Sequence, residues 1–389
     1  MNTSKFGLSN QICLENQKEY NMEDTERKLA TIDTILDLQP IEGADRIEVA
    51  KIRGWNVVVK KGEFSIGDKC VYFEVDSVLP ADDERYNFLK NAFNSRLNGY
   101  RIKTVRMRGQ ISQGLALPIT EFPELEYRVK EGTLNVGDDV TELLNVRIYT
   151  EPISNVMGAK SKSTFPSELI QKTDAERYQN IDFNNWYQNV INADSHGHTL
   201  TFISTEKLDG TSFVVFQDPD GNVRMCSRNR ELQIEDGESV YHYIFNKYKF
   251  REIFEDQNYV FPFAIYGEII GPSIQKNVYG LSDYEFHVFN MFDIENQVYF
   301  SWRSVEDIAD MYGLNTVKQY LPPMTALQIY DSFHGKTDNE IQNKMFRGFE
   351  RKNPVEGWVF RPLFAFTREY RDKLMFKVIN NDYLLKHEG

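Results

Sequence analysis

Glu206-Lys207-Leu208-Asp209-Gly210-Thr211-Ser212 is the stretch on which the fold and the chemistry of this chain depend. It joins two runs of strand character, residues 199–205 and 211–217, around a tight Asp-Gly turn. A lysine at the end of a strand can act as a nucleophile when burial or neighbouring cations lower its pKa. Taken alone, the K-x-D-G pattern is explained equally well as a simple hairpin turn.

Five further polar motifs follow Lys207, each inside an apolar run that predicts a strand. They are Ser227-Arg228-Asn229, Tyr266-Gly267-Glu268-Ile269, Phe289-Asn290-Met291-Phe292-Asp293, Glu356-Gly357-Trp358-Val359 and Lys373-Leu374-Met375-Phe376-Lys377. Any one of them has an ordinary structural explanation, as a strand-end charge, a turn or a surface lysine. Chance is a poor explanation for all five in this order after K-x-D-G, and the set indicates a catalytic site.

The C-terminal half combines strands and helices. Apolar runs predict strands over 261–270, 286–292, 358–361 and 373–379. Apolar side chains at helical spacing predict helices over 240–256, 304–312 and 324–333, and core packing explains these stripes. Asp174 is expected to cap one more short helix. Residues 166–389 are therefore expected to form one α+β domain.

The region before this domain has a different sequence pattern, with short apolar runs in place of long helical stripes. Apolar runs at residues 29–38, 46–53, 55–60, 69–75, 101–108, 114–117 and 139–144 are separated by turn residues. Many short strands at close spacing predict a small β-barrel over 29–150. Residues 1–28 are polar and are expected to form an extension. Residues 151–165 carry Pro, Ser, Gly and Lys and are expected to form a linker.

The composition is that of an ordinary globular protein. The chain has 389 residues, of which 41% are hydrophobic and 26% charged, and this length suggests two or three domains. No apolar run reaches the roughly 18 residues of a membrane span, and residues 1–28 lack the apolar core of a secretory signal. Cys13, Cys70 and Cys226 lie far apart, which excludes a disulfide framework and a cysteine zinc site. We expect a cytoplasmic protein.

Two other motifs carry little weight. His196-Gly197-His198 lies in a polar, glycine-bearing loop with no cysteine nearby, so a satisfied surface pair is favoured over a metal site. Residues 62–69 read G-E-F-S-I-G-D-K, which places Asp68 where a phosphate-binding loop needs lysine. No kinase domain is expected.

The net charge of −13 argues against nucleic-acid binding by bulk charge. One local strip differs, because no Asp or Glu interrupts the cations Arg96, Arg101, Lys103, Arg106 and Arg108. The strip is either a solvated hairpin or a surface that follows phosphates. Trp55 is likewise either a core residue or a base-stacking platform.

As a set, these motifs resemble the covalent nucleotidyltransferases, the superfamily of ATP-dependent RNA and DNA ligases and mRNA capping enzymes. The resemblance covers about residues 199–380. Segments 40–80 and 172–180 and the ending Phe376-Lys377-Val378-Ile379-Asn380 are similar to one clade of RNA ligases with an N-terminal OB domain. Only 12 residues follow Lys377, too few for the C-terminal domain of DNA ligases and capping enzymes.

The resemblance implies an OB-type β-barrel followed by a nucleotidyltransferase domain with antiparallel sheets and flanking helices. It also implies an ATP-dependent RNA ligase that seals a 3′-OH/5′-phosphate nick. In that family, lysine takes AMP from ATP and releases pyrophosphate, AMP passes to the RNA 5′-phosphate, and the 3′-OH then displaces AMP. Lys207 corresponds to this nucleophile, and nearby positive charge is expected to lower its pKa.

The resemblance also assigns the other site residues. The ATP-binding set is Glu206, Asp209, Gly210, Arg228, Glu268, Phe289 and Glu356, with Phe289 stacked on adenine. Asp209, Glu268 and Glu356 are expected to hold Mg²⁺ or Mn²⁺. Lys377 matches the terminal lysine, while Met375 departs from the usual K-x-K pattern and Lys373 is expected to substitute for it. RNA binding is expected at Arg101, Lys103, Arg106 and Arg108.

Three alternatives stay open at this point. The chain could be a DNA ligase or a capping-type enzyme, although its short C-terminal flank counts against both. It could be a non-catalytic RNA-binding protein with a decayed nucleotidyltransferase domain. Its N-terminal module could also act like the tRNA-binding OB domains of synthetase-associated factors, which would change the substrate and not the chemistry. In each case we expect a monomer without membrane association.

Overall fold

The structure is a computed structural model that describes residues 27–149, 158–193, 200–235, 237–256, 262–349 and 354–387. These residues form two compact units. The N-terminal unit consists of residues 27–149, 336–348 and 380–387, and the C-terminal unit contains the described residues of 158–335 and 349–379. Residues 1–26 of the predicted extension, about half of the predicted linker and the His196–His198 motif lie outside the described residues. Among the described residues, no helix is long and apolar enough to span a membrane.

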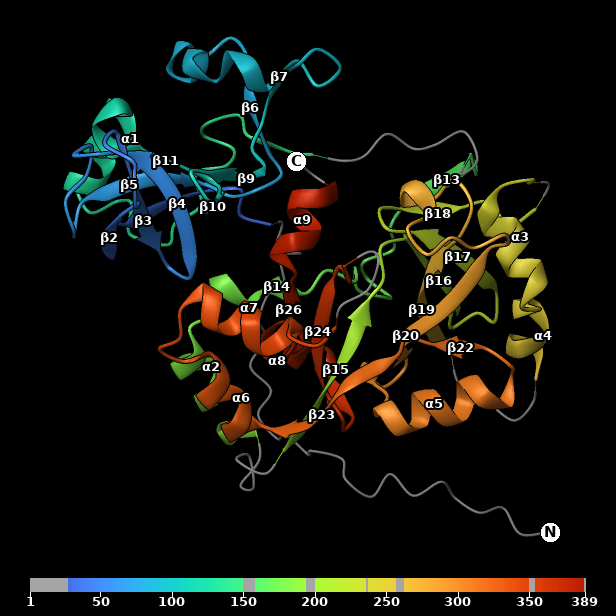
Figure 1. Cartoon of the computed structure of the whole chain (residues 1–389). Coiled ribbons are helices and arrows are strands. Elements are labelled where there is room, and N and C mark those ends of the chain that lie inside the picture. Colours follow the sequence, from blue (N-terminus) through green and yellow to red (C-terminus); the bar gives the residue numbers. More distant parts are fainter. Residues whose placement is uncertain are drawn as a thin grey trace. The chain divides into compact units, whose positions relative to one another are not determined.

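The N-terminal unit is built from short, mostly antiparallel strands (Figure 1). In chain order they are β1 (Ala30–Thr34), β2 (Asp37–Pro40), β3 (Ile47–Ile52), β4 (Trp55–Lys60), β5 (Lys69–Phe73), β6 (Ser77–Pro80), β7 (Phe93–Asn94), β8 (Gly99–Arg101), β9 (Thr104–Met107), β10 (Gln110–Gln113), β11 (Leu115–Pro118) and β12 (Arg147–Ile148). They form the sheets β1-β5-β11, β2-β3-β4, β9-β10 and β12-β6-β8-β7. The helical segments are η1 (Glu84–Ala92), η2 (Ile119–Glu121), α1 (Pro123–Lys130), α7 (Asp338–Phe346) and α9 (Asn381–His387).

Strand β5 stands between two hydrophobic clusters, because neighbouring side chains on a strand point to opposite faces. Val71 and Phe73 belong to one cluster, whereas Cys70 and Tyr72 belong to the other. Trp55 is fully buried in the second cluster, with its ring centroid 6.2 Å from that of Tyr72. Trp55 is thus a core residue and not a platform for bases.

One predicted strand of this unit is wrong. Residues 139–144 form turns, and only an isolated bridge joins Asp139 to Thr31. The hydroxyl of Thr141 donates to Asp139 Oδ1 over 2.5 Å and accepts from the N–H groups of Leu29 and Ala30 over 2.9 and 3.0 Å. Side-chain bonds of this kind compete with strand ladders, and they hold this apolar run in a turn.

The C-terminal unit contains two sheets. The larger has the strand order β13-β18-β17-β16-β19-β20-β21-β25 with β22 paired to β20, and the smaller has the order β14-β26-β24-β15-β23. Their bounds are β13 (Ser161–Thr164), β14 (Glu176–Arg177), β15 (Thr201–Lys207), β16 (Thr211–Gln217), β17 (Val223–Ser227), β18 (Arg230–Leu232), β19 (Phe263–Ile270), β20 (Glu285–Asp293), β21 (Val298–Tyr299), β22 (Asn315–Thr316), β23 (Gln319–Thr325), β24 (Gly357–Pro362), β25 (Phe366–Thr367) and β26 (Phe376–Ile379). The helical segments are η4 (Tyr178–Asn180), α2 (Phe183–Ala193), α3 (Val240–Lys247), α4 (Phe250–Glu255), η6 (Gln275–Asn277), α5 (Trp302–Met311), α6 (Ala326–Phe333), η7 (Arg368–Tyr370) and α8 (Arg371–Leu374).

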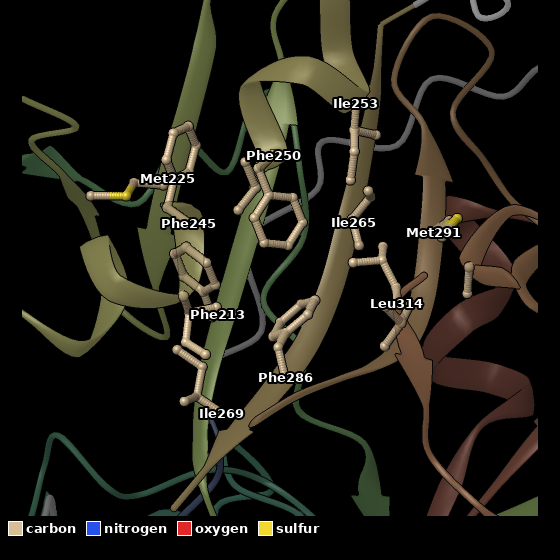
Figure 2. Packing of buried hydrophobic residues seen from close by; sticks show 14 of the residues in the cluster. Phe213, Met225, Phe245, Phe250, Ile253, Ile265, Ile269, Phe286, Met291 and Leu314 are labelled. Carbon is tan, nitrogen blue, oxygen red and sulfur yellow. The ribbon is translucent and has the colours of Figure 1, made fainter. Parts of the chain in front are cut away.

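A large hydrophobic cluster joins the helices α3, α4 and α5 to the larger sheet. At its centre, Phe213, Phe250 and Phe286 meet edge to face, with ring centroids 5.4–6.0 Å apart (Figure 2). Such pairs add about 0.5–1.5 kcal/mol each beyond simple burial. The cluster fixes β16, β19 and β20, and these strands carry candidate site residues at their ends and along their length.

The predicted fold class, short β-strands followed by an α+β region, is confirmed, with three local differences. The helix expected over 240–256 is broken at Lys249, whose φ of 53° separates α3 from α4. No helix begins at Asp174, because this residue lies in an extended segment before β14. The strand expected over 373–379 begins only at Phe376, since residues 371–374 form α8.

Candidate active site

The turn at residues 208–210 carries the chain from one sheet to the other. Strand β15 belongs to the smaller sheet and ends at Lys207, whereas β16 belongs to the larger sheet and begins at Thr211. Lys207 therefore lies at the point where strand ends from both sheets come together. Its neighbour across β24 is Gly357, and Ser212 pairs with Glu268 across β19.

Lys207 forms a close ion pair with Glu356. Its Nζ lies 2.5 Å from Glu356 Oε1, and 31% of the Lys207 side chain remains exposed. The second oxygen of this carboxylate, Oε2, is buried and has no hydrogen-bond partner among the described residues. The K-x-D-G and E-G motifs, which lie 149 residues apart in the sequence, thus meet in the structure.

Two glycines permit this close assembly. A Cβ atom at Gly210 would collide with the carbonyl oxygen of Ile269 and would lie 2.7 Å from Glu268 Cγ. A Cβ atom at Gly357 would collide with the carbonyl oxygen of Val378. Glycine is therefore required at both positions by the approach of a neighbouring strand.

The acidic side chains beside Lys207 are close enough to influence one another. Burial is the largest effect on Glu268 and raises its pKa to about 8. Lys207 and Arg228 lower this pKa, while the negative charges of Glu356 and Asp209 raise it. The N–H group of Asp209 donates to the hydroxyl of Tyr279 over 2.7 Å, which fixes the backbone of the turn.

The electrostatic state of Lys207 differs from the one expected from sequence. Burial acts to lower its pKa, but the attraction of Glu356, Glu268 and Asp209 outweighs burial, and the net shift of the Lys207 pKa is upward. The nearby charges are acidic and not basic. In this arrangement Lys207 is an ammonium group, and its activation requires that these carboxylates be neutralised.

Asp174 is a site residue that sequence reasoning missed. Its Oδ2 accepts a hydrogen bond from Arg228 Nη2 over 2.8 Å, and its Oδ1 accepts one from Lys377 Nζ over 2.7 Å. The carboxylate thus bridges two cations that were expected to contact nucleotide. The signal was present in the Lys172-Thr173-Asp174 segment, but Asp174 was interpreted as a helix cap.

The position of Lys377 follows from the sheet. It lies on β26, where it pairs with Val359 on β24 and with Arg177 on β14. Neighbours on both sides fix its direction, and only 13% of its side chain is exposed.

Lys373 does not join this cluster. It is exposed on α8, where its Nζ lies 5.2 Å from the ring centroid of Tyr370, and it forms no ion pair with any described residue. Met375 is buried at the end of α8. The structure therefore gives no support to Lys373 as a substitute for the missing lysine at position 375.

Phe289 and Glu206 occupy different surroundings. Phe289 lies on β20 and is half-buried, and the buried guanidinium of Arg361 donates to its carbonyl oxygen and lies 5.9 Å from its ring. Burial lowers the pKa of Arg361 to about 9. Glu206 is buried, and its N–H donates to the carbonyl of Lys318 over 2.8 Å. Arg361 is a second residue that the sequence did not single out.

The four cations predicted to bind RNA lie in the N-terminal unit and differ in availability. Arg101 is largely buried, pairs with Asp76 over 2.8 Å and lies over the ring of Tyr149. Arg106 and Arg108 are exposed in the β9–β10 hairpin, and Lys103 is half-buried just before it. Lys103, Arg106 and Arg108 can reach a phosphate more readily than Arg101 can.

The carboxylates suit a hard divalent cation that shares its ligands with phosphate and water. Within the described part of the chain, no group of three His, Cys, Asp or Glu side chains is arranged to hold a metal by itself. The buried, unpartnered oxygen of Glu356 and the nearby carboxylates of Glu268 and Asp209 are the donors that Mg²⁺ and Mn²⁺ prefer. These residues fit a cation that arrives together with a nucleotide.

The chain is similar to two known protein families and to solved structures of an RNA ligase. An OB-fold domain family matches residues 29–119, and the RNA ligase family matches residues 200–379. Among solved structures, Naegleria gruberi RNA ligase with pyrophosphate is 34% identical, covers 93% of this chain and 99% of its own, and has a TM-score of 0.78. Two variants of that ligase, one with ATP and Mn and one with AMP and Mn, are each 33% identical with the same coverage and TM-scores of 0.77 and 0.76. No curated protein matches the chain.

Proposed function

The chain belongs to the RNA ligase family and is an ATP-dependent RNA ligase, and we propose that it works through an AMP group carried on Lys207. The observation that carries the proposal is the Lys207–Glu356 ion pair, at the point where both sheets of one unit present charged side chains. All candidate nucleotide-binding residues come from this one unit, so we infer that one copy of the chain suffices for the reaction.

The first step forms a bond between Lys207 Nζ and the α-phosphorus of ATP. The bond from that phosphorus to the bridging oxygen breaks, and pyrophosphate leaves with the electron pair. Lys207 must lose a proton before it attacks, and Glu356, 2.5 Å from Nζ, is positioned to accept it. Arg228 and Lys377 supply positive charge to the phosphates once Asp174 has been displaced.

The next two steps return Lys207 to its starting state. An oxygen of the RNA 5′-phosphate attacks the phosphorus of the bound AMP, and the phosphorus–nitrogen bond breaks. The 3′-hydroxyl of the other strand then attacks the 5′-phosphate, and AMP leaves as the phosphodiester forms. Both steps need an attacking oxygen in line with the leaving group, and charged side chains around Lys207 stabilise the charge that develops.

Glu356, Glu268 and Asp209 are the residues that would hold a divalent cation. When bound, such a cation supplies positive charge that neutralises phosphate oxygens and weakens the attraction of the carboxylates for the Lys207 ammonium.

Phe289 is the proposed platform for adenine, since its half-buried ring lies on β20, the strand that pairs with β19 and Glu268. We assign Glu206, adjacent to Lys207, to the wall of the same nucleotide site. The carbonyl contact of Arg361 fixes the backbone beneath the Phe289 ring.

Nick sealing tests the function. The substrates are two nicked duplexes that are identical except that the 3′-OH strand is RNA in one and DNA in the other. We expect the wild type to seal the RNA-ended nick with ATP and a divalent cation, and the Lys207→Ala variant to seal neither. Sealing of the DNA-ended nick at an equal rate would identify a DNA ligase instead. Failure of the wild type on both substrates would contradict the proposal.

A further inference from the structure

The N-terminal unit contains a long stretch without acidic residues. Between Glu84 and Glu121 there is no Asp or Glu, although acidic residues outnumber basic ones by 58 to 45 in the whole chain. The stretch carries the cations Arg85, Lys90, Arg96, Arg101, Lys103, Arg106 and Arg108. A polyanion would meet less repulsion here than on the surrounding surface of this acidic protein.

Within this stretch, residues 87–96 form a segment that we call the aromatic arm. It comprises the end of η1, the strand β7 and the residues up to Arg96, and all its residues except Leu89 are exposed. Phe88 and Phe93 are 58% and 47% exposed. Figure 1 shows the arm around β7 set apart from the strands β1–β5 of the same unit.

Both ends of the arm are anchored, so the exposure of its rings is not the result of a loose segment. At one end, Tyr86 is fully buried and meets the ring of Phe73 edge to face at 5.7 Å. At the other end, β7 pairs with β8, where Phe93 lies opposite Tyr100 and the two ring centroids are 5.9 Å apart. The phenylalanines are therefore presented to solvent by a fixed backbone.

The cations of the arm are available to a ligand. Arg85, at its base, is paired with Asp83 and Glu124 over 2.7 Å. By contrast, Lys90 and Arg96 are exposed and form no ion pair with any residue that the structure describes. The arm thus combines two exposed aromatic rings with two unpaired cations, the combination that proteins use to bind single-stranded nucleic acid.

We propose that the aromatic arm binds unpaired RNA bases of the substrate, with Phe88 and Phe93 stacked on bases and Lys90 and Arg96 on phosphates. A ring can stack only on a free base face, and bases inside a duplex have both faces covered by their neighbours. The arm therefore favours ends that are frayed, mismatched or looped over a fully paired nick. The assignment to RNA rests on the proposed function.

The test is fluorescence anisotropy with the full chain, without ATP, on two nicked RNA duplexes. One is fully paired, and the other has mismatched nucleotides at the 3′-OH side of the break. We expect the wild type to bind the mismatched substrate more tightly. Phe88→Ala and Phe93→Ala should each weaken that binding roughly five- to a hundredfold, the loss typical of one base–aromatic stack. Binding of the paired nick should change little.

Matched variants separate the arm from general surface effects. Tyr127 on α1 is 65% exposed but lies outside the stretch without acidic residues, so Tyr127→Ala should leave both affinities unchanged. Lys90→Gln and Arg96→Gln should each lower the slope of log affinity against log salt by about 0.7, whereas Lys61→Gln, outside the stretch, should not.

Failure of this inference is distinguishable from failure of the proposed function. Transfer of label from α-labelled ATP to the protein reports the proposed function, and the arm variants should retain it, which also shows that they fold. If the wild type labels and seals but the Phe88→Ala and Phe93→Ala variants bind the mismatched substrate as the wild type does, the arm does not bind RNA. A change in sedimentation with unchanged RNA affinity would assign the arm to a protein partner and overturn the proposal.

Discussion

We propose that Lys207 is the nucleophile, and its surroundings keep it protonated until the charge of the nearby carboxylates is neutralised. Its ammonium is stabilised by Glu356 at 2.5 Å and by the charges of Glu268 and Asp209. These carboxylates hold Lys207 in place and keep it protonated. The same carboxylates would hold a divalent cation, whose positive charge would weaken their attraction for the Lys207 ammonium.

The two C-terminal lysines provide a matched pair. Lys377 lies on β26 and pairs with Asp174, whereas Lys373 is exposed on α8. We expect Lys377→Ala to slow formation of the lysine-bound AMP by about 100-fold, the scale of losing one positioned charge in the transition state. Lys373→Ala should leave the rate unchanged. Rapid-quench measurement with α-labelled ATP gives both rates. A comparable loss in the two variants would contradict the placement of Lys373.

Glu268 predicts a pH dependence of stability. Because burial raises its pKa to about 8, the folded protein keeps a proton that the unfolded chain loses near the ordinary value of 4.5. The folded state thus loses stability as the pH rises from about 4.5 to 8. Glu268→Gln removes this pH-dependent loss of stability. At pH 8 the variant should have a higher Tm than the wild type, with an unfolding free energy greater by a few kcal/mol, whereas at pH 4 the two should be equal.

Calorimetry without nucleotide or metal checks this prediction. With Mn²⁺ and ATP added, the order should reverse, since only the wild type retains the carboxylate that binds the cation. An equal Tm difference at pH 4 and pH 8 would show that Glu268 does not retain a proton in the folded protein.

Asp174 is expected to compete with phosphate for Arg228 and Lys377, because its carboxylate pairs with both cations. Each ion pair is exposed on at least one side and is worth about 0.2–1 kcal/mol. Replacement of Asp174 by Asn removes both pairs, so the affinity for ATP should rise between about twofold and thirtyfold. Titration calorimetry on the variant and the wild type provides the comparison. Weaker ATP binding would identify Asp174 as a residue that positions the two cations.

At the scale of elements, the β15–turn–β16 connection determines the geometry of the candidate site. It places the end of β15, in the smaller sheet, against the larger sheet, to which β16 belongs. The turn has no room for a side chain at Gly210, where a Cβ atom meets the backbone of Ile269. Gly210→Ala should cost about 1–3 kcal/mol of unfolding free energy and displace Asp209 and Lys207. Denaturant unfolding measures the loss, with Gln217→Ala at the far end of β16 as the control. Full stability and full activity of Gly210→Ala would show that the turn is not tightly constrained.

The strands around the site could be predicted from the sequence, because their apolar runs are uninterrupted and end in charged motifs. Strands β15, β16, β19, β20 and β24 lie within one or two residues of their predicted bounds. The turns at residues 139–144 could not be predicted, because hydrogen bonds of the Thr141 hydroxyl override the strand character of this apolar run. The ion pairs of Asp174 could not be predicted from the sequence either, because they connect residues that lie 54 and 203 positions apart.

At the scale of the whole molecule, the grouping of the chain departs from a simple division into an N-terminal and a C-terminal part. Residues 336–348 and 380–387 belong to the N-terminal unit, although they follow α6 and β26 of the C-terminal unit. Asn381 shows the basis of this grouping, because its buried amide donates to Asp338 and accepts from Gln113 of β10. No pattern in the sequence indicates such long-range hydrogen bonds, whereas composition alone separates the two main regions.

The central claim is that Lys207 carries AMP, and one measurement tests it directly. The protein is incubated with α-labelled ATP and Mg²⁺ or Mn²⁺, denatured and digested, and the labelled peptide is identified by mass spectrometry for the wild type and the Lys207→Ala variant. The account predicts one AMP group on Lys207 in the wild type and none in the variant. AMP on another lysine, or label that persists in Lys207→Ala, would contradict it.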